Sequence, residues 1–201
     1  MEGRGHAVNR ATISRRRALQ QVALLLGGAV SAPTVAGVFS TATRRAWAAS
    51  PAWAPRTLSA AQLELVATLT EHIIPQTETP GARAAGVHRF VDALLTDHYQ
   101  AAERDRFLAG LAGVDAHARS RYGKTFGESA IEQQLALLRE LDAAAYAATR
   151  GEDTWFFRRV KELTLVGYYT SEIGAMQELH VSPFGAYRGD IPYTSVGRAW
   201  A

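Results

Sequence analysis

The stretch that decides the fold is 155-WFFRRVKELTLVGYYTSEIGAMQEL-179, which predicts a long helix. Between Leu163 and Tyr169 this helix is apolar or aromatic on nearly every side, which is typical of a helix buried by several neighbours. Asp153 or Thr154 is expected to cap its start. We therefore expect a central helix surrounded by the others. Its inward face would be Phe156, Val160, Leu163, Gly167, Thr170 and Gly174.

Two glycines lie on that buried face, Gly167 and Gly174. Each costs about 1 kcal/mol relative to alanine in a helix interior. Their presence indicates either that another backbone comes close to the helix there or that the helix bends. The aromatic end of the helix is expected to be free to contact something outside the chain.

Four further helices are predicted before the central one. The first follows a capping box at Ser59 and ends before Pro75. The second covers about 87–98, and the third runs from near residue 102 to a glycine stop at 123. The fourth follows a capping box at Ser129, with an inward face of Leu135, Leu138 and Leu141. Since no segment alternates as a strand does, the sequence predicts an all-α fold, a compact bundle of about five helices with an extended C-terminal tail.

Composition restricts the possible functions. The chain has 201 residues, of which 47% are hydrophobic and 20% charged, and this favours one globular domain. The absence of cysteine excludes disulfides, thiolate chemistry, iron–sulfur ligation and covalent haem attachment. The net charge of +3 comes from residues 1–48, which hold seven Arg and one Glu, while the remainder holds 15 Lys and Arg against 18 Asp and Glu. The folded body is therefore acidic and offers no electrostatic case for binding nucleic acid.

Residues 1–48 resemble a twin-arginine signal peptide. A mildly apolar run over about 22–38 follows the basic segment, and Ala46 and Ala48 are small residues at the two positions that a signal peptidase inspects. The signal residues are Ser14, Arg15, Arg16 and Leu19. We expect cleavage after Ala48, a lead-in over 49–58 and a helical domain over 59–201.

Because the twin-arginine route carries folded proteins, this leader predicts a periplasmic protein that folds, or meets a partner, before export. The alternative is an uncleaved membrane anchor, since the apolar run approaches the length of about 20 residues that spans a bilayer. Glycine, proline, serine and threonine dilute the run and favour export.

The sequence assigns no catalytic, cofactor-binding or metal-binding residue. None of the six histidines belongs to a His-x-x-x-His, His-Glu-x-x-His or Glu-x-x-His motif, and no phosphate-binding glycine loop or Gly-x-Ser-x-Gly elbow occurs. His88 and Asp92 are four residues apart and are expected to form a local polar pair. These observations argue against an independent redox enzyme.

Aromatic residues gather towards the C-terminal end of the chain and are candidates for a partner interface. Protein interfaces favour Tyr, Trp and Phe, although core packing could use all of these side chains. The candidates are Trp155, Tyr168, Tyr169, Phe184, Tyr187 and Tyr193, together with Glu172. The Pro- and Gly-rich segment 181–193 is expected to be an extended tail on a surface.

The carboxylates near these aromatic residues allow two interpretations. Glu162, Glu172 and Glu178 are either solvated or capped, or Glu172 joins Thr170 and Ser171 in a buried polar network that fixes the turn at the two tyrosines.

Two segments resemble the gluconate 2-dehydrogenase subunit 3 family. Residues 73–87, IIPQTETPGARAAGV, are similar to its segment IIP-x-T-x-TPGA-x-x-AGV, and residues 156–178 resemble its second block, above all in 161-KELT-164 and 167-GYYTSEIG-174. The tail 185-GAYRGD-190 is similar to the closing PG-x-Y-x-G, with Phe184 where proline is usual.

The resemblance implies a non-catalytic small subunit of a periplasmic sugar or sugar-acid dehydrogenase associated with the inner membrane. It implies a large subunit of the glucose-methanol-choline type that holds FAD, and a multihaem cytochrome c subunit that takes the electrons. The small subunit would escort the folded flavin subunit through the twin-arginine translocase and stay bound to it. The alternative is a stand-alone periplasmic enzyme or binding protein with a pocket near Tyr168, Tyr169 and Glu172.

Overall fold

Five α-helices and a short π-helix occupy the part of the chain that the computed structural model describes, residues 53–147, 152–180, 192 and 194. No described residue lies in a β-strand, which confirms the all-α fold. The leader, with its predicted signal and cleavage residues, and the tail residues Phe184, Tyr187 and Tyr193 lie outside these ranges. The elements are α4 (Ala60–Ile73), α5 (Val87–Asp97), α6 (Ala101–Tyr122), α7 (Ile131–Tyr146), α8 (Glu152–Thr170) and η1 (Ile173–Glu178).

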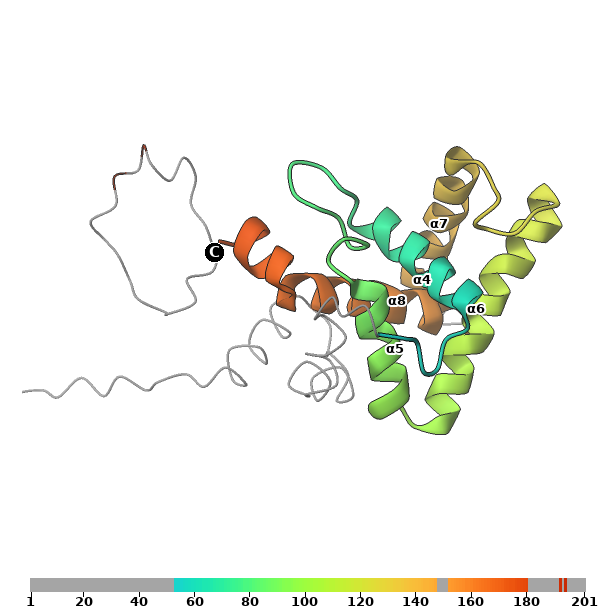
Figure 1. Ribbon diagram of the computed structural model, residues 1–201. Helices are drawn as coiled ribbons and strands as arrows, with labels where there is room; N and C mark the ends of the chain where they lie inside the picture. Colours follow the sequence, from blue (N-terminus) through green and yellow to red (C-terminus); the bar gives the residue numbers. More distant parts are fainter. Residues whose placement is uncertain (1–52, 148–151, 181–191, 193, 195–201) are drawn as a thin grey trace, which may run out of the picture. The chain divides into compact units, whose positions relative to one another are not determined.

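Helix α8 is the central element, because it contacts α4, α5, α6, α7 and η1 (Figure 1). Phe156, Val160 and Leu163 are buried on its inward face, and Phe107 of α6 packs edge-on against Phe156 with ring centroids 5.2 Å apart. The helix begins at Glu152, however. The expected caps at 153 and 154 therefore lie inside its first turn, and that prediction was wrong.

The predicted helix over 155–179 is broken at Ser171. The Ser171 hydroxyl donates to the carbonyl of Tyr168 (2.6 Å) and accepts from the backbone N–H of Gly174 (3.1 Å), so a side chain takes the place of helical backbone bonds. A Cβ on Gly174 would lie 2.0 Å from the Tyr168 carbonyl oxygen, so the bend requires glycine. At Gly167 the close neighbour is the ring of Phe90 in α5, 2.7 Å from an added Cβ, and not a second backbone.

Among the other helices, the ends follow the sequence closely except at α7. Ser59 caps α4 with the predicted capping box, and Gly123, at φ 72°, ends α6 in the left-handed conformation. At α7 the cap is Ala130, whose N–H donates to the side chain of Gln133 (3.0 Å). Ser129 instead donates to Thr125 O in the preceding turn (2.8 Å), so the predicted box was one residue early.

The inward face of α7 is correspondingly shifted. Leu137 and Leu138 are buried, whereas Leu135 and Leu141 are only half-buried. The prediction found one of the two buried leucines.

The segment before α4 is irregular but firmly attached to α5. The Asp92 carboxylate, 1% exposed, accepts the backbone N–H groups of Arg56 (2.9 Å), Thr57 (3.0 Å) and Leu58 (2.8 Å). The Asp92 carboxylate thus binds the backbone of the lead-in, and its predicted pairing with His88 was wrong. In the described ranges, no helix is both long and apolar enough to cross a membrane.

Candidate functional site

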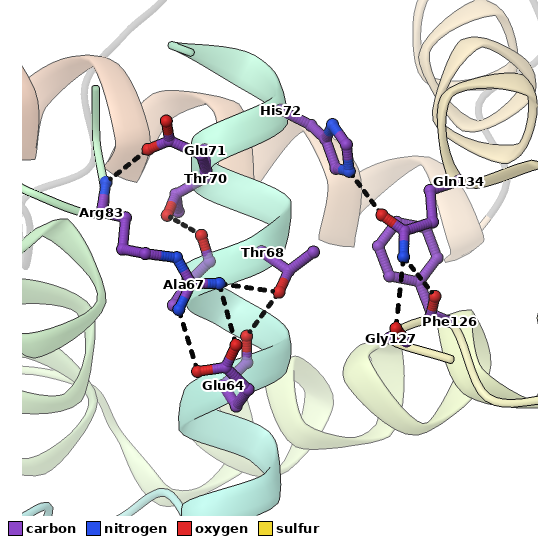
Figure 2. Close-up of polar contacts among 10 residues, drawn as sticks. All are labelled: Glu64, Ala67, Thr68, Thr70, Glu71, His72, Arg83, Phe126, Gly127 and Gln134. Atoms are coloured by element: carbon purple, nitrogen blue, oxygen red, sulfur yellow. Dashed lines mark hydrogen bonds and ion pairs between the residues drawn. The ribbon is translucent and has the colours of Figure 1, made fainter. Parts of the chain in front are cut away.

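The loop between α4 and α5, residues 75–86, is held in one conformation by Glu71. One carboxylate oxygen accepts the N–H of Gln76 (2.9 Å), and the other accepts the N–H of Arg83 (2.8 Å; Figure 2). Gly81 packs directly on this carboxylate, since an added Cβ would lie 2.3 Å from Glu71 Oε1 and 2.6 Å from the Gln76 nitrogen. The loop therefore needs a carboxylate at 71 and no side chain at 81.

The side chain of Arg83 closes the loop against α4 a second time. Its guanidinium donates to both carboxylate oxygens of Glu64 (2.9 Å each) and to the Thr68 hydroxyl (3.0 Å; Figure 2). These hydrogen bonds raise the pKa of Arg83 and lower that of Glu64. Because both side chains face solvent, an ion pair of this kind stabilises the fold by only about 0–1 kcal/mol.

The loop is also joined to the end of α8 and to η1. The Tyr168 hydroxyl donates to the carbonyl of Pro80 (2.8 Å), and the Thr79 hydroxyl donates to the carboxylate of Glu178 (2.8 Å). Residues about 90 to 100 positions apart in the sequence thus meet through side chains. Tyr168 is 1% exposed, so its side chain fills the interior and links the loop to the helix.

The neighbouring residues of this junction face solvent. Tyr169 is 39% exposed and meets the Tyr168 ring edge-on at 5.3 Å, and Met176 in η1 is 44% exposed. Partial burial, then the negative charge of Glu178 and the nearby Tyr168, raise the pKa of Tyr169. Glu172 is exposed, which agrees with the interpretation of a solvated carboxylate and contradicts the alternative of a buried network. Ser171 makes the internal bonds at this turn.

The sequence model of the gluconate 2-dehydrogenase subunit 3 family matches residues 60–188 of this chain. The chain belongs to this family. No curated protein and no solved structure gives a significant match. The family is named for a subunit of a dehydrogenase, and the segments that suggested it, 73–87 and 156–178, are the ones that the structure joins through Tyr168 and Thr79.

In this subunit 3 chain, Trp155 lies far from the tyrosines. It is thirteen residues before Tyr168 on the same helix, a separation of about 20 Å at 1.5 Å per residue. Its ring lies beneath the guanidinium groups of Arg106 and Arg159, at 4.6 and 5.3 Å from the ring centroid. The structure therefore does not bring Trp155 into one patch with Tyr168 and Tyr169.

A buried amide that the sequence did not single out holds α4 to the start of α7. Gln134 donates through its side-chain nitrogen to the carbonyls of Phe126 (2.8 Å) and Ser129 (3.0 Å). Its oxygen therefore accepts from His72 Nε2 at 2.6 Å, and Figure 2 shows the contacts of Gln134 with His72 and Phe126. The only signal for it was a glutamine at an inward helical position. Across the described residues, no group of three His, Cys, Asp or Glu side chains is arranged to hold a metal ion.

Proposed function

We propose that this chain is the non-catalytic small subunit of an FAD-dependent dehydrogenase of the gluconate or glucose type. The family match over residues 60–188 supports the proposal, because the family is named for a subunit of gluconate 2-dehydrogenase. In the proposed complex FAD belongs to a large subunit of the glucose-methanol-choline type, and haem c belongs to a multihaem cytochrome subunit. This chain binds the flavin subunit and supplies neither cofactor.

The leader gives the small subunit a second role in the proposal, as an escort. Export by the twin-arginine route would carry the flavin subunit, already folded and loaded with FAD, into the periplasm with this chain bound to it. The anchoring of Arg56, Thr57 and Leu58 by Asp92 supports this role, because it attaches residues that lie within about ten positions of the predicted cleavage site at Ala48 to the helical body. A signal joined closely to a folded body suits a route for folded cargo. The complex would then remain associated with the inner membrane.

The escort role is tested by a conservative change in the signal. In cells that produce both subunits, Arg15→Lys with Arg16→Lys should leave the flavin subunit in the cytoplasm, as measured by its activity and immunoblot signal in separated fractions. The matched control is Arg4→Lys with Arg10→Lys, which makes the same chemical change outside the Ser14–Leu19 motif and should leave export intact. Normal arrival of the flavin subunit in the periplasm with the first variant would refute the escort role.

A further inference from the structure

In the described residues, large apolar side chains are exposed at the two ends of α7 and at the bend after α8. Ile131 and Tyr146, 63% and 57% exposed, lie at the two ends of α7, whereas Tyr169 and Met176 lie on either side of the bend at Ser171. Cations already cover the Tyr146 ring, since Arg158 and Lys161 lie 5.1 and 4.8 Å from its centroid. Tyr169 and Met176 at the bend are therefore in different surroundings from the Tyr146 ring on α7, which already contacts two cationic side chains.

The two described segments that meet at the bend, residues 163–180 and the loop residues 75–82, carry acidic side chains and no lysine or arginine. The acidic side chains are Glu78, Glu172 and Glu178. None of these three carboxylates takes part in an ion pair found among the described residues; those pairs are Arg56–Asp97, Arg83–Glu64, Arg119–Asp115, Arg121–Glu140, Arg159–Glu162 and Lys161–Asp142. The bend thus has an apolar centre, Tyr169 and Met176, and an acidic edge formed by the three glutamates.

This surface is also held rigid from beneath. Glu71 fixes both ends of the loop, Tyr168 fixes its middle at Pro80, and Thr79 ties it to η1 through Glu178. A surface that is already ordered loses little conformational entropy when it binds, which raises affinity without additional contacts.

The charge decides which occupant fits. Anionic lipid headgroups would be repelled by the carboxylates, and a second copy of this chain meeting through the same face would set carboxylates against carboxylates. The complementary partner is a protein with an apolar recess edged by arginine or lysine. We propose that Tyr169, Glu172 and Met176, with the loop tip at Glu78, form the surface on which this chain binds the flavin subunit, whose matching surface has that chemistry. This inference rests on the proposed function.

The test uses the full chain, tagged and co-produced with the flavin subunit, and measures flavin absorbance per mole of purified tagged chain and the affinity between the separated subunits. Tyr169→Ala with Met176→Ala should weaken binding at least tenfold, as expected for truncation of a central aromatic contact. Glu172→Lys, at an exposed residue, should also weaken binding and should reduce the dependence of affinity on salt. Ile131→Ala with Tyr146→Ala is the matched control and should bind as the wild type does. Far-UV circular dichroism and thermal melting verify that each variant is folded.

The possible results distinguish failure of the proposed surface from failure of the proposed function. If the Tyr169 and Met176 variant and Glu172→Lys retain wild-type affinity, the surface is refuted while the proposed function stands. The same conclusion holds if only the α7 control loses binding, or if the bend variants alter self-association or binding to anionic vesicles and not the flavin subunit. If the wild-type chain carries no flavin subunit at all, the proposed function fails, and this inference fails with it.

Discussion

Replacing Glu71 by glutamine should release the loop over 75–86 while the surrounding helices stay folded. In the wild type the two oxygens of this carboxylate accept the N–H groups of Gln76 and Arg83 at 2.9 and 2.8 Å. A glutamine amide has one oxygen and one NH₂ group. One of the two backbone N–H groups therefore keeps an acceptor oxygen, which is now uncharged. The other N–H faces the amide NH₂ group, which is itself a donor and cannot accept its hydrogen bond.

The size of the effect follows from these two bonds. A hydrogen bond to a charged group contributes about 1.5–3 kcal/mol, and one between neutral groups about 0.5–1.5 kcal/mol. Since Glu71 is only half-buried, we take values at the low end. The lost charge on one bond and the loss of the other bond together favour loop opening by about 2.5 kcal/mol. Local opening of that size accelerates amide exchange by roughly 70-fold.

Hydrogen exchange followed by NMR measures this directly at the amides of Gln76 and Arg83. The control is Glu64→Gln, which makes the same chemical change about two turns away on α4 and breaks only the exposed ion pair with the Arg83 side chain. An exposed pair is worth about 0.2–1 kcal/mol, so exchange should change by no more than about fivefold. Wild-type exchange rates in Glu71→Gln, or equal acceleration in both variants, would show that the carboxylate does not hold the loop.

Two further predictions concern stability. Gly174→Ala should lower the free energy of unfolding by more than about 2 kcal/mol, because the new Cβ would lie 2.0 Å from the Tyr168 carbonyl oxygen. Gly113→Ala in α6, where a new Cβ would have no atom within 4 Å other than nearby atoms of its own helix, should raise the free energy of unfolding by about 0.5–1 kcal/mol. Urea titration compares the two variants. Burial, then the positive charges of Arg89 and Arg83, lower the pKa of His88 from 6.5 to about 4, so the unfolded chain binds a proton more readily than the folded chain between those pH values. Stability should therefore fall as the pH drops from 7 to 5, and His88→Gln should reduce that fall by about 1 kcal/mol once solvent screening of this partly exposed ring is allowed for. An unchanged pH dependence in His88→Gln would contradict this assignment.

The helices were predictable because their signals are local. A capping box at Ser59 and a left-handed glycine at Gly123 fix backbone hydrogen bonds within a few residues of themselves, so the sequence contains the whole interaction. The burial of α8 on several sides was predictable for a related reason. A helical segment that is apolar on nearly every side, such as 163–169, is stable only when neighbouring elements bury it.

The wrong predictions concern polar side chains that form hydrogen bonds with backbone groups far away in the sequence, or with a neighbouring turn instead of the expected helix. Asp92 was expected to bond within its own helix, but it accepts three N–H groups from residues 56–58, which no local pattern reveals. Ser129 fits a capping box in sequence, yet the preceding turn takes its hydroxyl. Ser171 ends α8 although the apolar period continues to Ile173, because its hydroxyl competes for backbone groups that the helix would otherwise use.

The candidate site shows why a sequence can identify the residues of a surface without separating inside from outside. Tyr168 and Tyr169 are adjacent and chemically identical, but neighbours on a helix point about 100° apart, so one can be buried while the other is exposed. Which of them turns inward depends on the rotation of α8 about its axis. That rotation is set where Gly167 meets Phe90 of α5, since any larger side chain at 167 would overlap the ring. With Gly167 facing α5, the Tyr168 hydroxyl reaches Pro80 and orders the loop, while Tyr169 is left near Glu178 at the surface. A glycine on one side of the helix thus determines which tyrosine holds the loop and which is available to a partner.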